Sequence, residues 1–204
     1  MVTYEPGVTA RAEDLEALAP RAVVGTLGAV AEPPAGAALY VSCGDPEARA
    51  HSGRVPDLSG ARALLVNAAE ARLLTGARTA EEALQRLAAG APTVVVTLGS
   101  RGATAVIEGR EVTAAAVDGG PAIDTTGAGD LFVAAYIWAD LRGAAPEARV
   151  RWATLYAALS VTRPTGTGGA VTEARLIEEG TRLGLPRHPV PAGHASSTPS
   201  PMEG

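Results

Sequence analysis

The stretch TAEEALQRLAAGAPTVVVTLG, residues 79–99, places an amphipathic helix pattern directly before a short apolar strand pattern. Thr79 is a suitable N-cap, and Gly90 a suitable terminal residue, for a helix over 79–90. Residues 93–99 are rich in valine and threonine, which is typical of a buried strand in a parallel sheet. Helices that alternate with such strands build α/β folds, so this stretch predicts an α/β domain.

The same alternation extends upstream of this stretch. Helices are predicted from Thr9 and after residue 67, the second one ending at Gly76. The connection between residues 27 and 37 is shorter than the roughly dozen residues that a parallel crossover needs. Either its helix is very short or the two flanking strands are not neighbours. Strands are predicted at 1–6, 21–27, 37–42 and 61–67.

Downstream, two alternating segments between residues 103 and 117 predict a β-hairpin that turns at Glu108 and Gly109. Residues 1–185 are predicted to form one domain, with a parallel sheet covered on both faces. The segment 186–204 is rich in Pro, Ser and Gly and lacks periodicity, which predicts a disordered tail. Further helices are predicted at 127–143, 146–162 and 171–184.

Composition narrows the classes of function. The 204-residue chain has a formal charge of −5, which argues against nucleic acid or an anionic membrane as its main partner. All 17 basic residues are arginine, so Schiff-base chemistry and the P-loop lysine are excluded. The start shows no signal-peptide pattern, and no apolar run reaches the roughly 18 residues of a membrane span. With Cys43 as its single cysteine, the protein is expected in the reducing cytoplasm.

The segment AIDTTGAGD, residues 122–130, joins a glycine-rich turn to an apolar helix. Its small residues allow a ligand to approach the free backbone N–H groups at the start of that helix. Those groups and the positive end of the helix dipole form an anion site suited to phosphate. Asp130 lies in the first turn, where its carboxylate could accept a proton from an attacking hydroxyl. The simpler interpretation is a glycine-containing loop with an acidic residue at a helix start.

The run DTTGAGD, residues 124–130, followed by an apolar helix, resembles the second signature of the ribokinase (PfkB-type) family of carbohydrate kinases. The resemblance implies a ribokinase-like three-layer α/β sandwich with a mostly parallel central sheet. It also implies that Asp130 is the catalytic base. The backbone amides of Gly127, Ala128 and Gly129 would then stabilise the transferring phosphoryl group.

The same resemblance implies two cation sites. Asn67 and Glu70 match an N-x-x-E element of the family, which acts around Mg²⁺ and the nucleotide phosphates. Glu70 would contact the metal through water, as suits a cation that sheds water reluctantly. Asp124 and Thr126 would help to hold a monovalent cation such as K⁺. Taken alone, N-x-x-E is more simply a helix cap with an acidic first turn.

A nucleotide site is implied by two further matches. TLGSRGA, residues 97–103, resembles the family's nucleotide-phosphate loop, with Thr97, Gly99 and Gly102 as the matching positions. Without the resemblance, this segment would be a strand followed by a glycine turn. The helix and loop around AALSVTRPTGTGGA resemble the family's adenine shelter, and a nucleotide-contacting residue would fall at Thr154.

The resemblance as a whole implies an enzyme that transfers the γ-phosphoryl group of ATP, with Mg²⁺, to a sugar hydroxyl. The family's first strands, sugar-binding motif and lid would lie before Met1, so the chain is expected to be an N-terminally truncated, C-terminal portion of the family's domain. A homodimer is a further expectation. The alternative is a catalytically impaired nucleotide-binding fragment or regulatory paralogue of a sugar kinase with the same fold.

Overall fold

The centre of the fold is a six-stranded sheet whose strands lie side by side in chain order. The computed structural model describes residues 12–28, 33–164 and 168–185. The first four strands are parallel, and the last two continue the sheet in antiparallel fashion. The strands are β1 (Ala22–Thr26), β2 (Ala38–Ser42), β3 (Ala63–Asn67), β4 (Thr93–Thr97), β5 (Ala103–Ile107) and β6 (Arg110–Ala114).

The strand predictions within the described residues are confirmed, with slightly narrower limits. The predicted hairpin joins β5 to β6, and its turn residues Glu108 and Gly109 have φ angles of 51° and 79°. Two successive positive φ angles are what a two-residue type I′ hairpin turn requires. The strand predicted at 1–6 and the tail predicted at 186–204 lie outside the described residues.

The connection between β1 and β2 corrects one expectation. The two strands are adjacent and parallel, with Ala22 opposite Ala38, so the alternative that they are not neighbours is wrong. The described residues of this connection, 27–28 and 33–37, contain no helix. Because an extended chain advances up to about 3.3 Å per residue, the connection can return to the start of a parallel neighbour without a helix.

The predicted helices are found, and Thr79 and Gly76 act as the expected caps, whereas the helix predicted to end at Gly90 ends at Ala88 with Ala89 as its C-cap. The Thr79 hydroxyl accepts the N–H of Glu82 at 3.1 Å, and Gly76 ends its helix with a φ of 66°. A helix after β2 was not predicted, although Pro46 suits its first turn. The helices of the described residues are α1 (Ala12–Glu16), α2 (Asp45–Ala50), α3 (Ala68–Thr75), α4 (Ala80–Ala88), α5 (Ala128–Asp140), α6 (Pro146–Ser160) and α7 (Glu173–Arg182).

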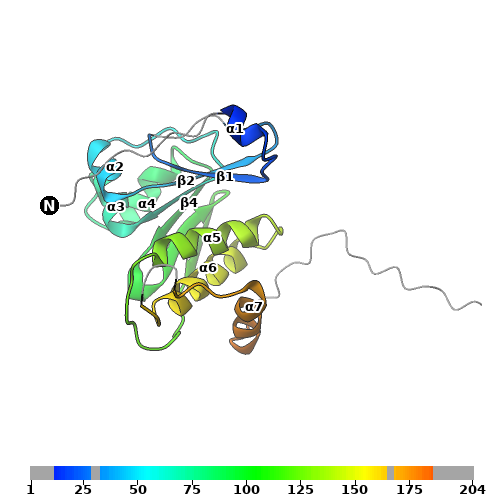
Figure 1. The fold of residues 1–204 in the computed structure, drawn as a ribbon. Helices are drawn as coiled ribbons and strands as arrows, with labels where there is room; N and C mark the ends of the chain where they lie inside the picture. Colours follow the sequence, from blue (N-terminus) through cyan, green and yellow to red (C-terminus); the bar gives the residue numbers. More distant parts are fainter. Residues whose placement is uncertain (1–11, 29–32, 165–167, 186–204) are drawn as a thin grey trace, which may run out of the picture.

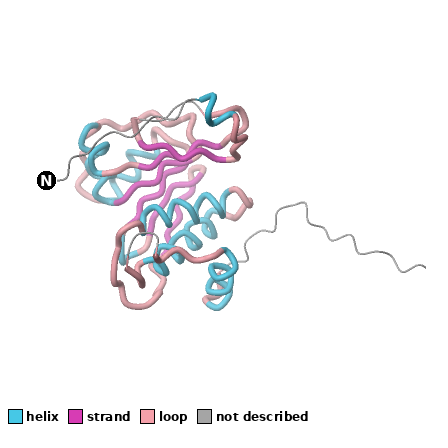
Figure 2. The backbone as a smooth tube through the Cα atoms, in the orientation of Figure 1, coloured by secondary structure: helices cyan, strands magenta, loops and turns pink. Residues whose placement is uncertain are grey.

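The helices cover both faces of the sheet, which confirms the three-layer sandwich (Figures 1 and 2). Successive strand residues point to opposite faces. Leu64 and Val66 of β3 therefore pack in a cluster with α3 and α4, while Leu65 packs in a cluster with α5 and α6. None of the helices in the described ranges combines the length and the apolar character needed to cross a membrane.

A buried polar cluster ties α5 and α6 to the sheet. The Asp140 side chain, at the end of α5, is 2% exposed. It accepts a hydrogen bond from the Tyr40 hydroxyl at 2.6 Å and two from the Arg62 guanidinium at 2.9 and 2.8 Å. Arg149 of α6 lies 3.0 Å from the same carboxylate. One carboxylate thus connects the strand region around β2 and β3 to both helices on this face.

Candidate functional site

The carboxyl ends of β3 and β4 bring two predicted site elements together. Asn67, the last residue of β3, is the direct register partner of Thr97, the last residue of β4. In open α/β sheets, ligands bind beyond the carboxyl ends of the parallel strands. The register therefore places the N-x-x-E element and the start of the glycine turn at the edge where a ligand is expected.

Asn67 and Glu70 form a capping box at the start of α3. The Asn67 Oδ1 accepts the N–H groups of Ala69 and Glu70 at 2.8 and 2.9 Å. The Glu70 carboxylate in turn accepts the N–H of Asn67 at 2.8 Å. Glu70 is buried, and this burial raises the pKa of its carboxyl above the ordinary value, although the bond from Asn67 lowers it. The pair thus serves as the helix cap that the simpler interpretation described.

This geometry bears on the predicted magnesium site. The described residues contain no group of three or more His, Cys, Asp or Glu side chains placed to hold a metal ion. Asn67 and Glu70 are engaged with backbone amides of their own helix. Asn67 and Glu70 therefore do not form a set of direct protein ligands for Mg²⁺. A contact of Glu70 with Mg²⁺ through water stays a prediction.

After β4, the chain makes the tight turn η1 (Gly99–Arg101), which returns it into β5. Gly99 has a φ of 62°, and Gly102 has a φ of 95° with a ψ of −132°. The Gly102 carbonyl accepts the N–H of Leu98 at 2.7 Å, which closes the turn. A side chain at residue 102 would collide with the carbonyl oxygen of Ala114 on β6. Packing alone therefore requires glycine at this position.

The start of α5 places the DTTGAGD residues on one surface turn. Gly127 is the N-cap, with a left-handed φ of 77°, and its carbonyl accepts the N–H of Leu131 at 3.0 Å. The Asp124 Oδ1 accepts the N–H of Thr126 at 2.9 Å, so these two residues lie together. The Ala128 N–H donates to the Thr125 carbonyl at 3.2 Å, so a ligand would compete with this turn for that amide.

A cavity of about 510 Å³ lies between the glycine turn, the start of α5 and α6. Thr154 lies in its wall, although its hydroxyl donates to Val150 of its own helix at 2.8 Å. Asp130 is exposed and directly follows the wall residue Gly129. The cavity is lined by Thr97, Gly99, Ser100, Gly102, Ala116, Val117, Asp118, Gly119, Gly120, Ala122, Thr125, Ala128, Gly129, Phe132, Thr154, Ala157, Ala158 and Val161.

Residues 45–173 of the chain match the sequence profile of the pfkB family carbohydrate kinase. The chain belongs to the pfkB family. The matched region runs from α2 to the first residue of α7 and so includes the glycine turn, the start of α5 and the whole wall of the cavity.

Solved structures share the pfkB-family fold with this chain. A probable sugar kinase protein from Rhizobium etli is 24% identical, with a TM-score of 0.65, and the match covers 74% of this chain and 46% of that one. A Burkholderia thailandensis nucleoside kinase in complex with inosine is 23% identical, with a TM-score of 0.61 and coverages of 76% and 51%. Arabidopsis thaliana ribokinase complexed with ribose and ATP is 27% identical, with a TM-score of 0.61 and coverages of 70% and 47%. The chain thus spans about half the length of these structures.

The structure separates the predicted site residues into two groups. One group lines the cavity, although its elements lie far apart in the sequence: Thr97, Gly99, Gly102, Ala128, Gly129 and Thr154. The other group lies outside the cavity wall: Asn67, Glu70, Asp124, Thr126, Gly127 and Asp130.

Sequence reasoning missed the loop between β6 and α5. Asp118, Gly119 and Gly120 form part of the cavity wall, and the Asp118 carboxylate accepts the N–H of Gly120 at 2.9 Å. A side chain at residue 119 would approach the carbonyl oxygen of Ala158 on α6 to 2.5 Å, so glycine allows the loop to lie against the helix. The available signal was the Asp-Gly-Gly triplet, because such triplets mark tight turns.

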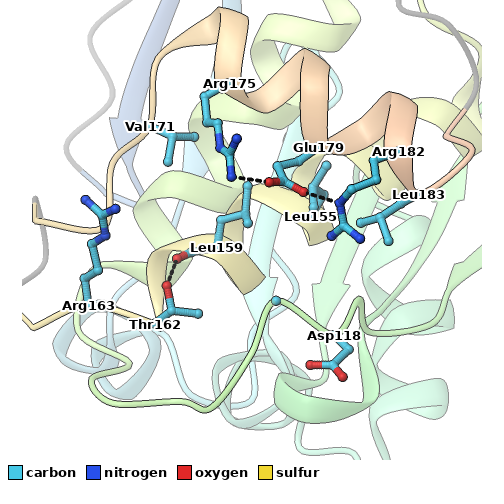
Figure 3. A pocket seen from close by; sticks show the side chains of 11 residues that line it. Asp118, Leu155, Leu159, Thr162, Arg163, Val171, Arg175, Glu179, Arg182 and Leu183 are labelled. Carbon is cyan, nitrogen blue, oxygen red and sulfur yellow. Dashed lines mark hydrogen bonds and ion pairs between the residues drawn. The ribbon is translucent and has the colours of Figure 1, made fainter.

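A smaller pocket of about 200 Å³ lies on the other side of this loop, between α6 and α7 (Figure 3). It shares Asp118 and Gly119 with the larger cavity. Along its rim, Glu179 pairs with Arg175 and, at 2.7 Å, with Arg182. These bonds hold the charged side chains of α7 in place above an apolar floor that includes Leu155 and Leu159.

Substitution of the two glycines of the turn should show which of the two positions requires glycine for packing. Gly102→Ala is expected to lower the free energy of unfolding by about 3 kcal/mol or more, because its backbone angles are nearly restricted to glycine and its new methyl group would collide with Ala114. Gly99→Ala meets no atom within 4 Å and should cost only about 1–2 kcal/mol for its left-handed φ. Urea unfolding measures both values. Equal costs would contradict the close packing of Gly102 against β6.

Proposed function

We propose that this pfkB-family chain is an ATP-dependent phosphotransferase that acts on a sugar hydroxyl. The observation that carries this proposal is the cavity at the carboxyl end of β4. Its wall combines the glycine turn with the first residues of α5, and Asp130 directly follows the wall residue Gly129. Phosphoryl transfer requires a phosphate cradle and a base for the nucleophile, and these elements could supply both.

In the proposed site, the amides at the start of α5 bind the transferring phosphoryl group. The helix has 13 residues, so its first turn presents N–H groups and the positive end of a full helix dipole. Asp130 deprotonates the acceptor hydroxyl, and its exposed carboxylate leaves room for an acceptor. The glycine turn from Thr97 to Gly102 contacts the nucleotide phosphates.

ATP is the proposed donor, and Mg²⁺, when bound with it, would neutralise phosphate charge in a protein that has no lysine. Arabidopsis ribokinase was solved with ribose and ATP, and the Burkholderia kinase with inosine. A pentose or a nucleoside is therefore the first acceptor to test. A role of Asp124 and Thr126 in binding K⁺ remains part of the proposal.

A second candidate function is nucleotide binding without transfer, as in a regulatory paralogue. This alternative is favoured because side chains predicted to contact the nucleotide or Mg²⁺ already form hydrogen bonds within their own helices. Asn67 and Glu70 cap α3, and the Thr154 hydroxyl donates to a carbonyl of α6. Under this alternative, the cavity binds ATP but no acceptor is phosphorylated.

Gly129→Ala tests the position of the phosphates. Gly129 lies in the cavity wall, and a methyl group there meets no protein atom within 4 Å, so the helix should tolerate it while the methyl fills ligand space. ATP affinity is expected to fall at least about tenfold, or 1.4 kcal/mol, by calorimetry with Mg-ATP. The matched control is Gly60→Ala, which also meets no atom within 4 Å but lies outside the cavity and should leave ATP affinity unchanged.

Coupled turnover on a panel of pentoses, hexoses and nucleosides then separates the two functions. ATP binding with acceptor-dependent release of ADP supports the kinase. ATP binding that is sensitive to Gly129→Ala but gives no turnover with any acceptor supports the paralogue. Absence of ATP binding, or equal binding by both glycine variants, would overturn the proposed site.

A further inference from the structure

The loop between β6 and α5 carries an exposed carboxylate, that of Asp118, in the wall of the larger cavity. Its Oδ1 atom accepts the N–H of Gly120 at 2.9 Å, which closes a short turn within the loop. Its other oxygen, Oδ2, accepts no hydrogen bond from any described residue. Figure 3 shows Asp118 apart from the ion pairs that Glu179 forms with Arg175 and Arg182. One carboxylate oxygen is therefore available to a ligand.

Close backbone packing fixes the position of this loop at both ends. A Cβ atom at Gly102, in the glycine turn, would approach the Ala116 nitrogen to 2.6 Å, so the loop begins against that turn. A Cβ atom at Gly119 would approach the Ala158 carbonyl oxygen to 2.5 Å, so the loop also lies against α6. Asp118 thus belongs to a segment of the cavity wall that runs from the glycine turn to α6.

The charge of Asp118 restricts which part of a nucleotide it can contact. Phosphate groups and a carboxylate repel each other, so the triphosphate is not expected beside this residue. An ionised carboxylate only accepts hydrogen bonds, so its partner in the ligand must be an N–H or O–H donor. The nucleoside part of ATP offers neutral donors of this kind in the amino group of adenine and the hydroxyl groups of ribose.

We propose that Oδ2 of Asp118 accepts a hydrogen bond from a neutral donor of the nucleoside part of the nucleotide. This inference rests on the proposed function, in which the cavity binds ATP. The turn bond to Gly120 holds the carboxylate in place before the ligand arrives. A bond to an ionised acceptor is stronger than one between neutral groups, so Asp118 should contribute measurably to affinity. Under the simpler interpretation, Asp118 only closes its own turn and contributes nothing.

Calorimetry with Mg-ATP on the full chain tests the proposal through Asp118→Asn. Asparagine keeps an Oδ1 acceptor for Gly120 but replaces Oδ2 with an NH₂ group, which cannot accept a hydrogen bond. ATP affinity is expected to fall about tenfold or more, the usual effect of losing a hydrogen bond to a charged group. Removal of the negative charge alone would act in the opposite direction, because it strengthens the binding of an anion.

The matched control is Asp57→Asn. Asp57 is also exposed and also accepts the N–H of the residue two positions later, Ser59, at 3.1 Å. It lies outside the wall of the larger cavity, so ATP affinity should not change in this variant.

Three analogues of ATP identify the donor that Asp118 binds. Purine riboside triphosphate lacks the amino group of adenine, and the 2′-deoxy and 3′-deoxy forms of ATP each lack one ribose hydroxyl. The effect of Asp118→Asn should vanish for the analogue that lacks the bound group. Tripolyphosphate has no nucleoside part, so the variant should bind it at least as tightly as the wild type does.

Wild-type affinity for ATP in folded Asp118→Asn would overturn the inference and leave the proposed function standing. So would a loss of affinity that extends to tripolyphosphate or persists with all three analogues. A wild-type chain that binds no ATP would overturn the proposed function and this inference with it. Circular dichroism shows whether Asp118→Asn is folded. If it is not, Asp118→Ser takes its place, because the serine hydroxyl can still accept the N–H of Gly120.

Discussion

Asp130→Asn is expected to lower the rate of phosphoryl transfer by about 10²–10⁴-fold, the usual contribution of a general base. The asparagine amide has the size of the carboxylate but cannot take the proton of the acceptor hydroxyl. Asp130 is exposed in the first turn of α5, so the substitution should not disturb packing. The expected change is in kcat, with ATP affinity retained, because the lost interaction belongs to the transition state.

The control for this experiment is Glu147→Gln. Glu147 is also an exposed acidic residue in the first turn of a helix, α6, but it lies outside the cavity wall. Both substitutions remove one negative charge near a helix N-terminus, so a general effect on the helix dipole would appear in both variants. Glu147→Gln should turn over like the wild type. Asp130→Asn with wild-type turnover would reject the role of Asp130 as the base.

Asp140→Asn is expected to lower the free energy of unfolding by about 3–5 kcal/mol, because removal of one partner from a buried ion pair leaves the other charge uncompensated. Arg149 would carry that charge, since its side chain is only 10% exposed. The Tyr40 hydroxyl and the Arg62 guanidinium would also lose a charged acceptor. Guanidinium unfolding measures the change, with Asp57→Asn as an exposed control that keeps its hydrogen-bond acceptor for Ser59.

The same variant should change how stability depends on pH. Burial raises the pKa of the Asp140 carboxyl, but hydrogen bonds from Arg62 and Tyr40 and the charge of Arg149 outweigh it and lower the pKa below its ordinary value. A carboxyl with a lowered pKa stabilises the fold above its unfolded pKa of about 3.9 and loses that contribution as pH falls through the folded pKa. The difference between wild type and Asp140→Asn should therefore be full at neutral pH and shrink below about pH 4. A difference that does not vary with pH would show that packing, not charge, makes Asp140 important.

Much of the fold could be predicted from local patterns. The run TVVVTLG and the caps Thr79 and Gly76 each act over a few residues, so sequence alone located them. The pairing of β1 with β2 was left open because the length of a connection does not determine what lies beside a strand. The Asp140 cluster was not predicted at all, since Tyr40 and Arg62 lie 100 and 78 residues from Asp140. Contacts at such separations leave no periodic pattern.

Only part of the candidate site was predicted, because that part depends on local sequence and the rest depends on contacts between distant segments. Gly129 was identified because small residues allow a ligand to approach the start of the helix, and Gly102 was identified through the family resemblance; both line the cavity. The loop with Asp118 was missed because its place in the wall depends on how it packs against α6. For Asn67 and Glu70, the helix-capping geometry seen in the structure is also what the local sequence predicts without any family resemblance.

The order of the strands has a consequence for how the protein folds during its synthesis on the ribosome. Among the described strands, each one from β2 to β6 lies beside the strand synthesised just before it, so this part of the sheet can grow by one strand at a time without waiting for later segments. The face of the sheet that holds Leu65 and Val95 must wait for later segments, because α5 and α6 cover it. These two helices are complete only when synthesis has reached Ser160. At about 5–20 residues per second, a nascent chain that has completed β6 exposes this apolar face on the order of seconds. During that interval, we expect the strongest binding of chaperones to the nascent chain and the strongest aggregation between nascent chains on the same polysome.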